Sequence, residues 1–229
     1  MSINHLTTTL MLAATAALAW PFLVPAGKPS PPAAAPVAIP ATPLAVRGAS
    51  TGRLDAPVVV LEFSDFECPF CGKFARETLP EVKRRYVDSG KVRFVFNHYP
   101  LERLHPLAMR AAVLAECARR QDAFWTVHDA LFASPQMVTR LLENPGDVGS
   151  LDQKTLSACR SSDEAAASVM ADREVARTLG LSGTPALLIG APAGNNLMKV
   201  QKVLFGAVTV DTFADAVESV ERGRSEPKS

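Results

Sequence analysis

Cys68 and Cys71 are the residues of this 229-residue chain best suited to chemistry, because two residues separate them in a Cys-Pro-Phe-Cys motif. Two thiols at this spacing lie on one turn of a helix and can close a disulfide ring, which is typical of thiol–disulfide exchange. Half of a zinc site and a structural bridge are the alternatives. Zinc normally needs a second such pair or nearby histidines. Neither is present, because Cys117 and Cys159 are isolated and no His lies within twenty residues after Cys71.

The segment before the motif must deliver these thiols. Residues 58–63 are an apolar, valine-rich run that predicts a strand buried on both faces, and residues 72–87 have helical apolar spacing. Cys68 is therefore expected at a helix N-terminus, where unpaired amides and the helix dipole stabilise a thiolate. Pro69 fits the first turn, and neither it nor Phe70 can hydrogen-bond the sulfur. We expect helix-end amides to lower the Cys68 pKa moderately below about 8.5.

Glu62 is a carboxylate within the otherwise apolar strand, six residues before Cys68. Burial would raise its pKa and allow it to exchange a proton with the Cys71 thiol. The alternative is that Glu62 reaches solvent at the end of the strand.

Four other polar residues near the motif allow weaker predictions. Asp65 and Glu67 flank the thiols and could oppose thiolate formation or recognise a partner. His98 and His105 are expected to be structural. No nearby Ser or Cys forms a hydrolytic triad with either histidine.

The N-terminal region differs in composition from the rest. Residues 1–25 contain an uncharged apolar run that predicts a signal peptide or a membrane anchor. Small residues at 17–19 favour cleavage. Against cleavage, no Lys or Arg precedes Lys28, so the positively charged start of a standard signal peptide is missing and an uncleaved anchor remains open. Residues 26–45 are rich in Pro and Ala and predict an extended linker.

The remaining chain alternates between strand and helix patterns. Residues 91–98 predict a second strand, and residues 105–180 contain only helical patterns. Residues 186–190 and 198–205 predict a hairpin, which residues 210–220 follow as an amphipathic helix. A hydrophobic content of 48% suffices for one sizeable domain, and a net charge of +1 argues against nucleic-acid binding.

The segment from Glu62 to Cys71, together with Gly183-Thr184-Pro185, resembles the DsbA-like branch of the thioredoxin superfamily over about residues 58–220. The resemblance implies an α/β thioredoxin fold with an inserted all-helical domain, spanning residues 46–225 with the insertion at about 105–180. It implies a thiol–disulfide oxidoreductase that needs neither a metal nor an organic cofactor.

The resemblance also implies roles for individual residues. Cys68 would be the nucleophile and Cys71 the resolving thiol, with Glu62 as the nearby acid. Thr184 and Pro185 would bind an extended substrate beside the dithiol, together with Pro69 and Phe70. The Thr184–Pro185 bond is expected to be cis on this ground, whereas the residues alone leave a trans turn equally open.

Cys117 and Cys159 lie on two predicted helices of the insertion, forty-two residues apart. An even cysteine count in an exported protein favours a structural disulfide, and some DsbA-like relatives carry a second bridge in this domain. Two buried thiols remain the alternative.

The expected setting is the periplasm or the extracytoplasmic face of the cell membrane. The partners would be exported protein thiols or disulfides and a membrane redox protein. A disulfide donor is favoured, but Thr184 before the proline also occurs in isomerase and reductase relatives. An envelope reductase or isomerase, and a redox-inactive holdase or binding module, are the alternatives.

Overall fold

A computed structural model describes residues 39–148 and 151–225 of the chain. The predicted export segment (1–25) and most of the predicted linker (26–45) lie outside the described residues. Within the described part, no helix is both long and apolar enough to cross a membrane.

A six-stranded mixed sheet forms the centre of the fold, with the strand order β1-β6-β5-β3-β4-β2. Only β3 and β4 pair in parallel, and the other neighbours are antiparallel. The strands are β1 (Leu44–Ala45), β2 (Ala49–Thr51), β3 (Val58–Ser64), β4 (Val92–His98), β5 (Ala186–Pro192) and β6 (Leu197–Phe205). All seven residues of the central strand β3 are buried, as its uninterrupted apolar run predicts.

Helices surround the sheet and fill the connection between β4 and β5. They are α1 (Pro69–Lys73), α2 (Leu79–Val82), α3 (Ala108–Arg119), α4 (Phe124–Phe132), α5 (Pro135–Glu143), α6 (Gln153–Arg160), α7 (Asp163–Thr178) and α8 (Val210–Ser225). Two π-helical segments, η1 (Phe74–Thr78) and η2 (Lys83–Val87), follow α1 and α2, and a short 3₁₀ turn, η3 (Pro145–Asp147), follows α5. The helix therefore begins inside the thiol motif, at Pro69, directly after Cys68.

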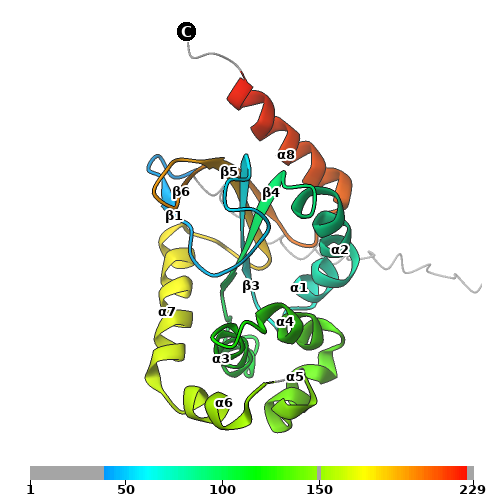
Figure 1. The fold of residues 1–229 in the computed structure, drawn as a ribbon, viewed down its shortest axis with the longest axis vertical. Coiled ribbons are helices and arrows are strands. Elements are labelled where there is room, and N and C mark those ends of the chain that lie inside the picture. Colours follow the sequence, from blue (N-terminus) through cyan, green and yellow to red (C-terminus); the bar gives the residue numbers. More distant parts are fainter. Residues whose placement is uncertain (1–38, 149–150, 226–229) are drawn as a thin grey trace, which may run out of the picture. The chain divides into compact units, whose positions relative to one another are not determined.

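Each face of the sheet packs against different helices. Val60 of β3 shares a hydrophobic core with Phe74 and Phe213, so the helix of the thiol motif and α8 cover this face. Leu61 points to the opposite face and shares a core with Ala176 of α7. Figure 1 shows α2 and α8 on one side of the strands and α7 on the other. The fold is thus a thioredoxin-like α/β layer structure.

The insertion consists of α3 to α7 and occupies residues 108–178, close to the predicted 105–180. Its helices α3 to α6 lie below the sheet in the view of Figure 1. The core of this helical region also includes Phe66, Cys68 and Cys71 from the thiol segment. Phe66 packs on Phe132 of α4, with 4.8 Å between ring centroids. The insertion therefore contributes directly to the environment of the dithiol.

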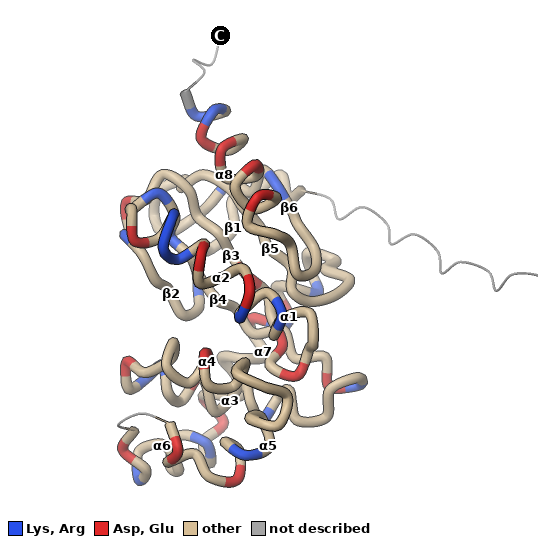
Figure 2. Tube along the Cα trace, turned by 90° about the vertical axis from the view of Figure 1, so that its right-hand side faces the viewer, with Lys and Arg blue, Asp and Glu red and all other residues tan. Residues whose placement is uncertain are grey.

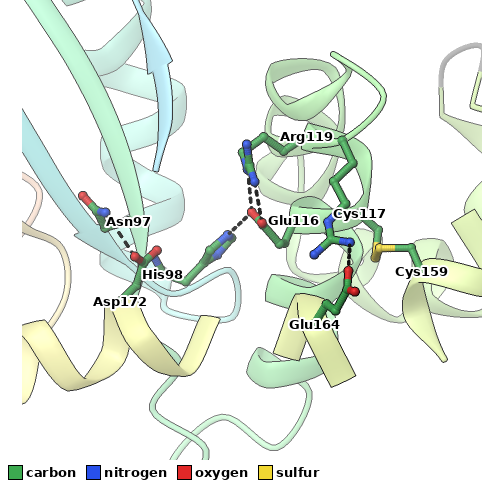
Figure 3. Close-up of polar contacts among 9 residues, drawn as sticks. Asn97, His98, Glu116, Cys117, Arg119, Cys159, Glu164 and Asp172 are labelled. Carbon is green, nitrogen blue, oxygen red and sulfur yellow. Dashed lines mark hydrogen bonds and ion pairs between the residues drawn. A yellow bond between two sulfur atoms is a disulfide. The ribbon is translucent and has the colours of Figure 1, made fainter. Parts of the chain in front are cut away.

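Buried polar contacts join the end of β4 to α7 and α3 (Figure 3). The Asp172 carboxylate on α7 accepts hydrogen bonds from the His98 backbone N–H at 3.0 Å and from the Asn97 side chain at 3.4 Å. His98 Nε2 lies 3.9 Å from the Glu116 carboxylate, which accepts two hydrogen bonds from Arg119. Burial lowers the His98 pKa to about 4, so this imidazole is neutral at pH 7. His98 is therefore structural.

Cys117 and Cys159 form a disulfide that joins α3 to α6 (Figure 3). The sequence favoured this pairing over two buried free thiols. The bond closes a loop with a sequence separation of 42 residues. Such a cross-link stabilises a fold mainly by restricting the unfolded chain.

We expect the Cys117→Ala/Cys159→Ala variant to lose about 2–4 kcal/mol of unfolding free energy. Urea unfolding of the variant and the parent would measure the loss. The single Cys117→Ala variant should lose at least as much, because it leaves a free thiol at Cys159. An unchanged unfolding midpoint in both variants would contradict this expectation.

Candidate active site

The dithiol lies where β3 ends and the first helix begins. The chain turns after Ser64, and the Cys68 N–H donates to the Asp65 carbonyl at 3.1 Å. Cys68 occupies the N-cap position of α1 with an extended backbone, and Pro69 takes the first helical turn. The predicted placement of Cys68 at a helix N-terminus is therefore correct. Phe70, the second residue between the cysteines, is 61% exposed.

Both cysteines are reduced, with no disulfide between them, and both are buried. Cys68 Sγ lies 3.4 Å from the carbonyl oxygen of Thr184, a contact in which the protonated thiol donates. Cys71 Sγ accepts a hydrogen bond from the Asp65 backbone N–H at 3.5 Å. The Thr184–Pro185 peptide bond is cis. The segment before β5 thus faces the first sulfur, although 116 residues separate the two in sequence.

The two thiols differ strongly in acidity. The hydrogen bond from the Cys71 thiol is the largest of several effects that lower the Cys68 pKa to about 5, outweighing burial. The Thr184 side chain and the backbone amides of Cys71 and Phe70 lower it further. Burial, followed by the neighbouring Cys68, raises the Cys71 pKa well above its usual value. Cys68 is therefore a thiolate at neutral pH while Cys71 keeps its proton.

This result corrects one expectation. The sequence indicated helix-end amides as the main stabiliser of the thiolate, whereas the partner thiol contributes most and the amides contribute less. The Thr184 hydroxyl is buried and has no other hydrogen-bond partner in the described chain, so it can turn towards either sulfur.

Glu62 is fully buried, and neither of its carboxylate oxygens has a hydrogen-bond partner among the described residues. Burial raises its pKa to about 7, and the nearby Ser64 hydroxyl and the Lys83 charge act in the opposite direction. The Ser64 hydroxyl also lowers the Cys71 pKa. The alternative in which Glu62 reaches solvent is wrong, because its strand is covered on both faces.

Asp65 has a structural function that the sequence did not reveal. Its buried carboxylate accepts hydrogen bonds from the backbone N–H of Glu67 and of Leu101, each at 2.8 Å, and lies 2.8 Å from His105 Nδ1. Glu67 in turn accepts from the Leu107 N–H. Both acids therefore hold the thiol turn against the chain that follows β4. Neither acid is a free surface group beside the sulfurs.

No group of three or more potential metal-binding His, Cys, Asp or Glu side chains occurs in residues 39–148 and 151–225. The arrangement contains an acidic thiol, a second thiol within reach and a buried acid. A mixed sheet that carries such a dithiol at a helix N-terminus, opposite a cis proline, defines a thioredoxin-like thiol–disulfide oxidoreductase.

Comparisons with known proteins agree with this class. A family model described as thioredoxin matches residues 45–203. The probable disulfide bond formation protein D of Bacillus anthracis is 30% identical over 64% of this chain and 71% of its own length. The crystal structure of DsbA2 from Pseudomonas aeruginosa has a TM-score of 0.62 and 28% identity, and the match covers 77% of this chain and 96% of that chain.

A third relative is the Na⁺/H⁺ antiporter NhaA 3 of Salinispora tropica, which is 33% identical over 76% of this chain and 26% of its own length. The chain spans about a quarter or less of the antiporters that it matches. The chain belongs to the thioredoxin family and is similar within it to disulfide bond formation protein D and to DsbA2.

Proposed function

We propose that the protein donates disulfides to the thiols of exported proteins. The observation that supports this direction is the low pKa of Cys68, lowered to about 5 from an ordinary 9.0. The thiolate exists only in the dithiol form, so its stabilisation favours reduction of the pair and makes the disulfide form a stronger oxidant. At pH 7 the effect amounts to about 3 kcal/mol. This energy corresponds to about 60 mV for a two-electron couple.

The proposed reaction begins when a substrate thiolate attacks Cys68 Sγ in the disulfide form. The new sulfur–sulfur bond joins substrate and Cys68, the bond to Cys71 breaks, and Cys71 leaves as a thiolate. A second substrate thiolate then attacks the substrate sulfur and releases Cys68 as its stable thiolate. Two electrons pass to the cysteine pair, and the substrate gains one disulfide.

Glu62 is the proposed proton donor to Cys71 in the first step. A leaving Cys71 thiolate is unfavourable because burial raises its pKa well above the usual value. A carboxyl group with a pKa of about 7 is partly protonated at neutral pH and can supply the proton. The Ser64 hydroxyl lowers the pKa of both groups and is the proposed link between them.

The proposed substrate-binding residues surround Cys68. The Thr184 backbone and Pro185 would pair with an extended substrate, and Pro69 and Phe70 would contact its side chains. Two exposed aromatic groups support this proposal, because Phe70 is 61% exposed and Phe205 is 40% exposed. Phe205 pairs with Ala186, the residue after Pro185. Exposed aromatic surface of this kind suits unfolded, cysteine-containing chains.

The proposed setting is the periplasm or the outer side of the cell membrane, with a membrane protein that reoxidises the cysteine pair. The names of the relatives support this proposal, since they include a disulfide bond formation protein and a DsbA. A signal peptide or anchor in residues 1–25 would provide the export.

The equilibrium potential of the Cys68–Cys71 couple against glutathione tests the direction. A donor should have a potential above about −200 mV, between DsbA at about −120 mV and the glutaredoxins. A potential near about −270 mV, the thioredoxin value, would instead identify a reductase. A pair that glutathione and dithiothreitol cannot reduce without unfolding would identify a redox-inactive binding module.

A further inference from the structure

A groove of about 610 Å³ lies between the chain after β4 and the C-terminal half of α7. Residues 99–104 form one wall, and Arg173 and Arg177 of α7 form the other. Leu104 on the rim is 73% exposed. No hydrogen bond described above joins any of these residues to Cys68 or Cys71. Leu101 is bonded to the thiol turn only through Asp65.

The charges in this groove are mainly positive. Its charged side chains are three arginines and one glutamate. Glu102 is neutralised by Arg173, with 2.5 Å between nitrogen and oxygen. Arg103 and Arg177 are exposed, and neither has an ion-pair partner within the described chain. Elsewhere Lys and Arg are interleaved with Asp and Glu along the trace (Figure 2), and many are paired.

Residues 99–104, one wall of the groove, are fastened on two sides to the segments that hold Cys68. On one side, the Leu101 N–H donates to the Asp65 carboxylate, and the Asp65 carbonyl accepts from the Cys68 N–H. On the other side, the Tyr99 hydroxyl donates to the carbonyl of Leu181 at 3.0 Å, three residues before Thr184. This wall thus joins the turn before Cys68 to the segment before Thr184, the two segments beside which the substrate is proposed to bind.

We propose that the groove binds acidic side chains of the substrate polypeptide on one side of its reacting cysteine. The proposal rests on the proposed function, because it assigns a sequence preference to the same exchange site. Arg103 and Arg177 would pair with Glu or Asp carboxylates, which arginine binds with two parallel hydrogen bonds. The net charge of the whole chain is only +1, so a preference for acidic substrates must come from such a local group.

The test uses oxidation of dithiol peptides by the oxidised protein, followed by stopped-flow fluorescence. Three matched peptides carry two Glu, two Gln or two Lys residues on the N-terminal side of the reacting cysteine, and three more carry them on the C-terminal side. In one of the two series, we expect the Glu peptide to react about tenfold faster than the Lys peptide at low ionic strength. The ratio should fall to about two in 0.5 M salt.

Variants attribute the preference to the groove. In Arg103→Gln/Arg177→Gln the ratio should fall to about two at low ionic strength. Arg103→Lys/Arg177→Lys keeps the charge but loses the paired hydrogen bonds, so its ratio should lie between that of Arg103→Gln/Arg177→Gln and that of the parent. The matched control Lys91→Gln/Lys154→Gln removes two exposed charges away from the groove and should keep the full ratio. A ratio near one in both peptide series, or a ratio that survives in Arg103→Gln/Arg177→Gln, would overturn the proposal.

Exchange with dithiothreitol, which has no charge, separates this proposal from the proposed function. If the parent protein oxidises dithiothreitol but does not distinguish the peptides, the groove proposal fails and the exchange function stands. If it oxidises neither dithiothreitol nor any peptide, both fail.

Discussion

Replacement of Cys68 by serine will abolish disulfide exchange, with a loss of at least about a thousandfold in the rate constant for a dithiol peptide. The serine hydroxyl cannot form the mixed disulfide, and Cys71 is fully buried with a raised pKa, so it cannot replace Cys68 as the attacking sulfur. Stopped-flow oxidation of a fluorescent dithiol peptide provides the measurement. A Cys68→Ser variant as fast as the parent would show that the reaction does not pass through this sulfur.

The Cys71→Ser variant is the matched control. It keeps the attacking sulfur and loses the resolving one. When its Cys68 thiolate attacks the disulfide of an oxidised substrate peptide, one peptide sulfur leaves as a thiolate, and the mixed disulfide should accumulate and be detected by mass spectrometry. Alkylation of the reduced parent by iodoacetamide should show a midpoint near pH 5, because the Cys68 pKa is lowered to about 5. Because folding lowers the Cys68 pKa, this thiolate stabilises the reduced protein. Its contribution to the unfolding free energy rises with pH from about 5 to about 9 and is lost as the pH falls through 5.

Replacement of Glu62 by glutamine will change both the stability and the rate. The carboxyl group has a pKa of about 7 in the folded protein against an ordinary 4.5, because it is completely buried. The unfolded chain therefore loses this proton at lower pH than the folded chain does. The unfolding free energy of the parent should fall by up to about 3 kcal/mol between pH 4.5 and pH 7 through this group.

The measurement should use the oxidised protein, in which Cys68 does not titrate. Asp172 also has a raised pKa, to about 6, so both proteins will lose some stability in this range. The difference between the parent and Glu62→Gln isolates the contribution of Glu62. If the unfolding free energies of the parent and of Glu62→Gln change with pH by the same amount across this range, burial does not hold Glu62 protonated.

The same variant tests the proton transfer. Glutamine cannot supply a proton to Cys71, so reduction of the disulfide form should slow by about a hundredfold at neutral pH, the lower end of the range for general acid catalysis. The parent rate should follow ionisation of a group near pH 7, and the variant rate should not. Equal rates at every pH would remove Glu62 from the mechanism.

Local patterns predicted the central part of the fold. The run at residues 58–63 lies in β3, because a strand buried on both faces needs a continuous apolar sequence. The insertion predicted at 105–180 contains only helices, since apolar residues at helical spacing fill the core of α3, α4 and α7. The position of Cys68 at a helix N-terminus followed from the strand pattern before it and the helical spacing after it, and the proline that follows Cys68 fits the first turn.

Elements whose stability depends on distant partners were not predicted. The strands β1 and β2 have two and three residues and form only by pairing with β6 and β4. The bounds of helix α5 within the predicted helical region were not given, although Ser134 and Pro135 form a recognisable helix start before Val138 and Leu141. The signal for this helix was present in the sequence, whereas the signal for the short strands was not.

Contacts in the site between segments that are distant in sequence were likewise not predicted. The Asp65 carboxylate joins Leu101 and His105 to the thiol turn across 36 and 40 residues, and no local pattern indicates such a contact. Arg103 and Arg177 become neighbours only because α7 returns to the chain after β4. The thiolate was predicted, but its main stabiliser was not, because that depends on how the two sulfurs face each other.

The aromatic contact of Phe66 has a consequence for protein engineering. This ring, two residues before Cys68, stacks on Phe96 of the sheet with 5.3 Å between ring centroids, and it packs at a tilt against Phe132 of the insertion with 4.8 Å between centroids. One side chain thus fills space in both halves of the domain. A miniaturised scaffold made by deleting the insertion would leave Phe66 without one of its two supports and would open Cys71 to water. The reactive turn therefore cannot be grafted alone onto a smaller thioredoxin fold with its acidity preserved.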